Sequence, residues 1–335
     1  MKCKRNYGID IARLLAMFMV ILLHNLSNGG ILQFDNTSLK NMNFWFIENL
    51  AIVAVNLFAL ITGFLMVEHK VRIKRLKSLW FEVWFWSVSI TLLVFLITQK
   101  FSLTMFIKSV FPVLFKEYWY FNAYIVLYLL IPFLNSGFNI LNHKKIKNII
   151  ISLVFLSVTA GFIGNLFEDE GYSALWLIVL YLIGATLKKV KIRINKNIFL
   201  ALYFLGAVVS LIGEFISLRF IGHTGHWLSY NSPIILLQSV SLFVYLVQIK
   251  VNNSFLKNFL RWASPLSFAV YLIDTNPSFF NLFHQKMSFI TDYNSGLGML
   301  ILIVISIILF MAFLLLDYIR YVTFNWVRKL KVRKY

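Results

Sequence analysis

The chain has 335 residues, of which 60% are hydrophobic and 13% are charged, and its mean hydropathy is +0.78. A soluble domain has about 45–50% apolar and about 25% charged residues, so this composition excludes a soluble enzyme and a disordered protein. The 32 Lys and Arg residues outnumber the 13 Asp and Glu residues, which gives a net charge of +19. In a membrane protein such an excess first indicates the positive-inside rule.

Apolar runs of about 20 residues, the length that crosses a bilayer as a helix, recur along the whole chain. We predict ten transmembrane helices, at 8–28, 44–67, 78–98, 118–137, 149–166, 174–188, 198–218, 232–250, 263–283 and 298–321. Residues 101–115 are too short for a span and predict a re-entrant or interfacial segment. No soluble insertion interrupts the pattern, so we expect residues 1–335 to form a single all-α integral-membrane domain.

The basic residues predict the topology. If the N-terminus lies inside, the acidic loop Glu168-Asp169-Glu170 falls on the outer side, and all the basic clusters fall on the inner side. These clusters lie at 2–5, 70–77, 144–147, 188–196, 250–261 and 320–334. The positive-inside rule therefore predicts cytoplasmic N- and C-termini and a multi-pass protein of the plasma membrane, surrounded by lipids. The excess charge is then no evidence of a nucleic-acid partner.

Arg13 and His24 lie on the first predicted span, where ionisable groups are costly and need a reason. They are 11 residues apart, which at 100° per residue is about 20° more than three full turns, with a separation of about 16 Å along the axis. The two side chains therefore share one helix face, which we expect to line a polar cavity. The alternative is an Arg that extends to the interface and a His that is hydrogen-bonded in the core.

Two carboxyl groups and one basic loop are further candidates. Glu48 lies near the outer end of the second predicted span, and Asp274 lies within the ninth, where an unpaired carboxylate would be expensive. Arg72 and Arg75 belong to the basic loop after the second span. They either set topology alone or bind an anionic cytoplasmic ligand such as a phosphate, because Arg forms bidentate contacts.

Neither a metal site nor a disulfide is predicted. The single cysteine, Cys3, has no partner for an internal disulfide. His223 and His226 have metal-ligand types at short spacing, but no further ligand is nearby in sequence.

Several motifs occur in order along the chain. They are Gly8-Ile9-Asp10-Ile11-Ala12-Arg13 followed by His24, then Val55-Asn56-Leu57-Phe58 with Thr62-Gly63-Phe64, then Arg72-Ile73-Lys74-Arg75, and then Trp119-Tyr120-Phe121-x-x-Tyr124 with Pro132-Phe133-Leu134-Asn135. Together they resemble the bacterial membrane acyltransferase-3 family from residue 8 to about residue 277. Ser267 to Asp274 also resembles that family's "SFxxYLIH", with Asp274 where a His is usual.

The resemblance implies an enzyme that moves an acetyl group from cytoplasmic acetyl-CoA to a hydroxyl of a cell-envelope, capsular or exopolysaccharide sugar. It implies that Arg13, Arg72 and Arg75 bind the phosphates of CoA. His24 would be the general base or would transiently carry the acetyl group, since imidazoles suit both roles, and Asp10 or Glu48 would orient it.

The resemblance also suggests residues that contact the substrate. Trp119, Tyr120 and Tyr124 would stack on a sugar or on adenine, or else belong to an interfacial aromatic belt. Asp274 would contact the substrate too, where it could accept a hydrogen bond or act as a base but could not mimic an imidazolium. No metal is expected in the reaction.

Other functions and partners remain open at this stage. A transporter or flippase of an envelope precursor is one alternative, and N-acetylation of an amino sugar is another. We expect a polysaccharide or a lipid-linked sugar as the acceptor, with polysaccharide biosynthesis machinery as a further partner. Because the sequence ends soon after the last predicted span, no appended extracytoplasmic domain is expected.

Overall fold

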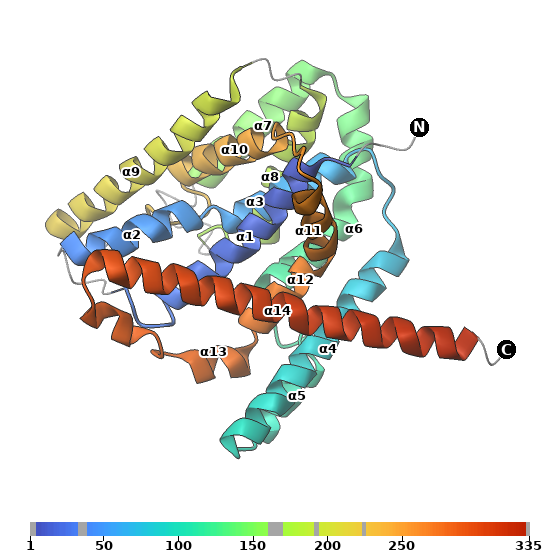
Figure 1. Cartoon of the computed structure of the whole chain (residues 1–335). Coiled ribbons are helices and arrows are strands. Elements are labelled where there is room, and N and C mark those ends of the chain that lie inside the picture. The colour runs from blue at the N-terminus through green and yellow to red at the C-terminus, as the bar shows by residue number, and fades with distance from the viewer. Residues whose placement is uncertain (1–4, 33–38, 160–169, 191–193, 223–225, 333–335) are drawn as a thin grey trace.

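The computed structural model describes residues 5–32, 39–159, 170–190, 194–222 and 226–332 (Figure 1). This part of the chain is helical and contains no strand, which confirms the all-α class. The helices are α1 (Tyr7–Leu26), α2 (Leu39–Ala51), α3 (Ala54–Met66), α4 (Ile73–Thr98), α5 (Leu103–Val110), α6 (Trp119–Ile140), α7 (His143–Val158), α8 (Ala174–Lys189), α9 (Lys196–Ile221), α10 (Pro233–Val247), α11 (Ser254–Ala263), α12 (Ser267–Asp274), α13 (Pro277–Phe283) and α14 (Ser295–Val332), with short 3₁₀ helices η2 (Ser264–Leu266) and η3 (Ser288–Asp292).

Among the described residues, six helical stretches are long and apolar enough to cross a membrane, so the predicted number of ten is not confirmed. They are Tyr7–Leu26, Asn41–Met66, Ile73–Thr98, Trp119–Ile140, Lys196–Ile221 and Ser295–Trp326. The predicted spans at 174–188 and 232–250 correspond to α8 and α10, which have only 16 and 15 residues. The predicted span at 149–166 begins within α7, and its residues 160–166 lie outside the described part of the chain.

The ninth predicted span is not one helix but several short ones. After α11 the chain continues into η2, whose second residue is Pro265, and after α12 Pro277 begins α13. Pro265 lacks the backbone N–H that a continued α-helix would need, and Pro277 disfavours helical conformation in Asn276, which is not helical, so the two prolines interrupt the predicted span. Residues 101–115 contain the eight-residue helix α5, which is too short to span, as predicted.

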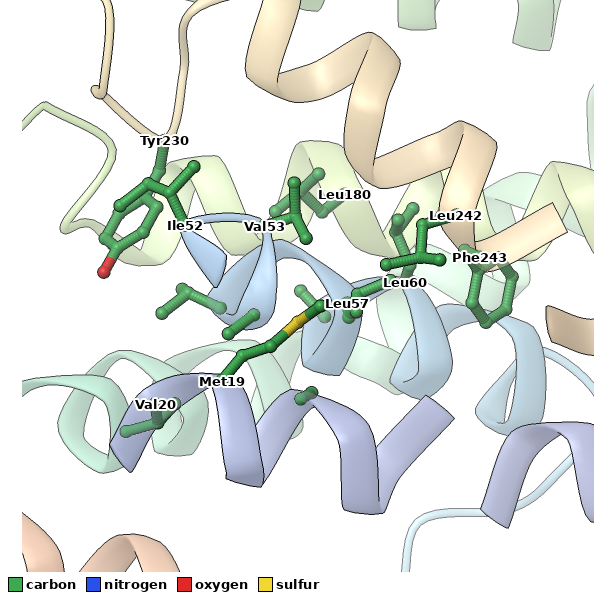
Figure 2. Packing of buried hydrophobic residues seen from close by; sticks show 14 of the residues in the cluster. Met19, Val20, Ile52, Val53, Leu57, Leu60, Leu180, Tyr230, Leu242 and Phe243 are labelled. Atoms are coloured by element: carbon green, nitrogen blue, oxygen red, sulfur yellow. The ribbon is translucent and has the colours of Figure 1, made fainter. Parts of the chain in front are cut away.

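The core lies where α1, α3, α8 and α10 meet. Figure 2 shows Met19 of α1 reaching toward Leu57 of α3, with Leu180 of α8 and Leu242 of α10 on the other side of α3; all four side chains are buried. A Cβ atom on Gly63 of α3 would overlap a backbone carbonyl of α8, and one on Gly184 of α8 would overlap a backbone carbonyl of α3. These two glycines therefore allow the two backbones to touch, as small residues do between membrane helices.

The last helix, α14, crosses the front of the bundle in Figure 1 and is joined to α4 by charged groups. Nη2 of Arg320 lies 2.9 Å from Glu82 Oε1, and its Nε lies 2.5 Å from Asp317 Oδ1. Trp86 of α4 donates from Nε1 to the same Asp317 oxygen at 3.0 Å. Arg320, which the charge pattern assigns to a cytoplasmic flank, is thus only 15% exposed and holds two helices together.

We expect Gly184→Ala to destabilise the protein by about 1–3 kcal/mol, because the added methyl group pushes α8 away from α3. The matched control is Gly137→Ala in α6, where an added Cβ meets no atom within 4 Å. This control should be neutral or stabilising by up to about 1 kcal/mol, since Ala is the better helix former. Thermal unfolding in detergent measures both, and equal midpoints for the two variants would contradict the close contact.

Candidate functional site

His24 lies in the last turn of α1, and the loop that follows is bound to a distant segment. The side chain of Asn28 donates to the carbonyl of Phe280 at 2.7 Å. The amide of Met287 donates to the carbonyl of Gly29 at 2.9 Å. A Cβ on Gly29 would lie 2.9 Å from the Cβ of Met287, so glycine permits this close approach. These bonds fix the end of α1 against residues that follow α12.

Asp274 is the last residue of α12, and only 4% of its surface is exposed. The helix ends there because Asn276 caps α13, its side chain accepting from the amide of Ser278 at 3.0 Å, and Pro277 begins that helix. At this position Oδ2 of Asp274 lies 2.6 Å from Nδ1 of His24. The two side chains form a hydrogen-bonded dyad between residues that are 250 positions apart.

The dyad determines which ring nitrogen of His24 is available for chemistry. An ionised carboxylate only accepts hydrogen bonds, so the proton of a neutral imidazole lies on Nδ1. Nε2 then has a free lone pair, and the side chain is 27% exposed. The ring of Phe280 packs edge-on against the imidazole, with 5.3 Å between centroids. A base oriented by a buried carboxylate is the arrangement that activates hydroxyl groups in many transferases and hydrolases.

A cavity of about 290 Å³ lies beside the dyad. Both His24 and Arg13 line it, as their shared helix face predicts. Arg75 and Glu82 of α4 form part of its wall, and Tyr230, which precedes α10, forms another part. Glu82 is already paired with Arg320, so the cations Arg13 and Arg75 are the charges available to a ligand in this wall, within the described residues.

Arg13 belongs to a hydrogen-bonded network with Asp10, Ser264 and Arg5. Neither Ser264 nor Arg5 was identified as a site residue from the sequence. Its Nη1 donates to Ser264 Oγ at 2.9 Å, and Ser264 donates to Asp10 Oδ1 at 2.9 Å. Arg5 Nε donates to the other oxygen of Asp10 at 2.6 Å. This hydrogen bond, and the opposite charge behind it, raise the pKa of Arg5. Asp10 therefore binds Arg5 directly and is linked to Arg13 through Ser264. Asp274, and not Asp10, is the carboxylate that contacts His24.

The basic loop after α3 borders a second cavity, of about 500 Å³. Its walls include Arg72 and Arg75, and it shares Arg75 and Met66 with the cavity beside the dyad, so the two spaces adjoin at these residues. The hydroxyl of Tyr128 accepts from the amide of Arg72 at 3.3 Å and donates to its carbonyl at 3.2 Å. Asn135 donates to the carbonyl of Met66 at 2.9 Å. Helix α6 thereby fixes the loop at two points.

The aromatic candidates Trp119, Tyr120 and Tyr124, on the first turns of α6, all line the cavity beside the dyad. Tyr120 and Tyr124 stack on each other, with 6.4 Å between centroids, and Trp119 stacks at 6.1 Å on Tyr230. Asn56 of α3 donates to the carbonyl of Tyr230 at 2.9 Å. The aromatic wall is therefore built from α6 and from the loop before α10.

Glu48 lies apart from the dyad. It is buried and lines neither cavity, and its Oε2 has no hydrogen-bond partner among the residues that the structure describes. Its neighbour Asn49 donates to Glu214 Oε2 at 3.1 Å, so these carboxyls lie between α2 and α9. Within the described residues, no three His, Cys, Asp or Glu side chains form a group that could hold a metal. His226 contacts Glu170 at 3.3 Å, and His223 lies outside the described part.

The comparisons with known proteins identify the family of the chain. Residues 6–316 match the family described as "acyltransferase domain", and the matched region contains both residues of the dyad as well as Arg13, Arg72 and Arg75. No curated protein and no solved structure matches the chain. Because the match covers most of the 335 residues, the chain belongs to the acyltransferase-3 family and is a membrane acyltransferase.

Proposed function

We propose that this acyltransferase moves an acetyl group from cytoplasmic acetyl-CoA to a sugar hydroxyl of a cell-envelope or capsular polysaccharide, or of its lipid-linked precursor, in the bacterial plasma membrane. The single observation that carries the proposal is the dyad of His24 and Asp274 at 2.6 Å, beside a cavity that adjoins a basic space. The dyad supplies a base, and the adjoining spaces supply room for a long, phosphate-bearing donor.

The dyad acts on the acceptor. Nε2 of His24 accepts the proton of the sugar hydroxyl while its oxygen forms a bond to the acyl carbon. The carbon–sulfur bond of the thioester then breaks, and the proton passes from His24 to the departing sulfur. Asp274, hydrogen-bonded at Nδ1, holds the ring in position and stabilises the imidazolium that forms between the two steps. No bond to the protein is needed, so His24 is the base rather than the carrier of the acetyl group.

The charges support entry of the donor from the side of the basic loop. Arg72 and Arg75 are exposed, and no acidic group of the described chain lies within 4 Å of either guanidinium. Phosphate groups fit such sites because guanidinium groups bind them through two parallel hydrogen bonds. Arg75 borders both cavities, so the nucleotide would lie in the basic space and the acyl end would reach past Arg75 toward His24.

We expect Arg75→Ala to weaken CoA binding about 10-fold or more, because hydrogen bonds to charged groups contribute about 1.5–3 kcal/mol. Isothermal titration of CoA into the purified full-length protein measures the effect. Arg219→Ala is the matched control, since Arg219 is an exposed arginine at the far end of α9. If both variants bind CoA as the wild type does, the donor site is wrongly placed.

Asp274→Asn should lower acetyl transfer about 10²–10⁴-fold, since the amide cannot fix the imidazole in the required tautomer or stabilise its charged form. The assay follows labelled acetyl from acetyl-CoA into polysaccharide in membranes that contain the enzyme and its native acceptor. His24→Ala should reduce transfer to background, and Asp292→Asn, an exposed acid in η3, is the control. Unchanged transfer by the His24 variant would refute the proposed chemistry.

A further inference from the structure

Ser264 lies between Arg13, with which it lines the cavity, and the carboxylate of Asp10. Its hydroxyl accepts from Arg13 Nη1 at 2.9 Å and donates to Asp10 Oδ1 at 2.9 Å. The direct distance from Arg13 Nη1 to Asp10 Oδ1 is 3.9 Å, which is too long for a hydrogen bond. The serine therefore takes the place of the direct pair that an Arg and an Asp one helical turn apart would otherwise form.

The separation leaves Arg13 with unused donors. A guanidinium has five N–H groups, and a direct bidentate pair with a carboxylate would occupy two of them. Within the described chain, the hydrogen bond to Ser264 is the only one that the Arg13 side chain makes. Its remaining donors are therefore available to an anionic group in the cavity that it lines together with Arg75.

Asp10 obtains its neutralising charge from another residue. Arg5 Nε lies 2.6 Å from Oδ2, on the side of the carboxylate away from Ser264. Arg5 also donates to the carbonyl of Leu260 at 3.4 Å, so the arginine bridges α1 and α11. Because Asp10 is satisfied by Arg5 and Ser264, it does not need a direct contact with Arg13.

The backbone holds Ser264 in place. Its amide caps α11 by donating to the carbonyl of Leu260, and Ser267 donates to its carbonyl at 2.9 Å. Pro265, which has no backbone N–H to donate, follows within η2, so the α-helical hydrogen-bond pattern of α11 ends at this serine. Ser264 is 2% exposed, which fixes its hydroxyl between the two charges.

We propose that Ser264 is a positioning residue which keeps Arg13 apart from Asp10 and so holds the guanidinium ready for the phosphate groups of the acyl donor. This inference rests on the proposed function, because CoA is the anionic ligand that it names. It assigns the serine no contact with the acyl group or the acceptor.

Isothermal titration of CoA into the full-length protein tests the proposal. In Ser264→Ala the guanidinium can close onto Asp10, and we expect the Kd for CoA to rise about 10-fold. Ser264→Thr retains the hydroxyl and should bind within about 2-fold of the wild type. Ser306→Ala is the matched control, because Ser306 is equally buried and contacts α1 through Asn25 but does not line the cavity.

A second background separates positioning from a general loss of structure. If the loss in Ser264→Ala arises because Arg13 pairs with Asp10, then the same change in the Asp10→Asn background should alter the Kd by less than about 3-fold. An equal loss in both backgrounds would show a merely structural serine and would overturn the proposal. So would a Ser264→Ala variant that binds CoA normally.

The outcomes also distinguish this inference from the function on which it rests. A wild-type protein that fails to bind CoA would overturn both. Wild-type binding that is weakened by Arg75→Ala but not by Ser264→Ala would leave the donor site standing and remove only the role of the serine.

Discussion

The contact between His24 and Asp274 requires that the ends of α1 and α12 meet, because the buried carboxylate of Asp274 could not remain unpaired without a large cost in free energy. Much of the local structure follows from this constraint. Helix α12 ends at the carboxylate because Asn276 and Pro277 begin the next helix. The loop after α1 is bound to the segment beyond α13, and Gly29 makes that approach sterically possible. The dyad is thus built by breaks in helices rather than by continuous spans.

The charges of the site are kept separate from one another in a similar way. Asp274 contacts His24, and Glu82 forms an ion pair with Arg320. Asp10 forms an ion pair with Arg5 and accepts a hydrogen bond from Ser264. As a result, none of these carboxylates accepts a direct hydrogen bond from the two guanidinium groups that line the cavity, although Asp10 lies 3.9 Å from Arg13 Nη1. This arrangement supports the proposal of a donor that carries phosphates, because guanidinium groups with unused donors bind phosphate well.

The sequence was sufficient to predict which side chains share the face of one helix. It did not predict contacts between side chains of different helices. The 3.6-residue period was enough to place Arg13 and His24 on one face, and both line the cavity. It could not show that Asp274 contacts His24, since the two lie 250 positions apart and no local pattern connects them. The dipeptides Ser264-Pro265 and Asn276-Pro277 are recognisable helix boundaries, but hydropathy alone merged them into one span. No sequence pattern indicated a role for Ser264, because its contacts with Arg13 and Asp10 come from a segment about 250 residues away.

In the proposed mechanism, Asp274 fixes the imidazole of His24 with its proton on Nδ1 and leaves Nε2 as the base. Nitrogen-15 NMR of histidine-labelled protein in lipid bilayers tests this directly, with the His24 signals assigned by their loss in a His24→Gln variant. We expect a neutral His24 that is protonated on Nδ1, and we expect this tautomer to lose its dominance in Asp274→Asn. A neutral His24 protonated on Nε2 in the wild-type protein would contradict the account.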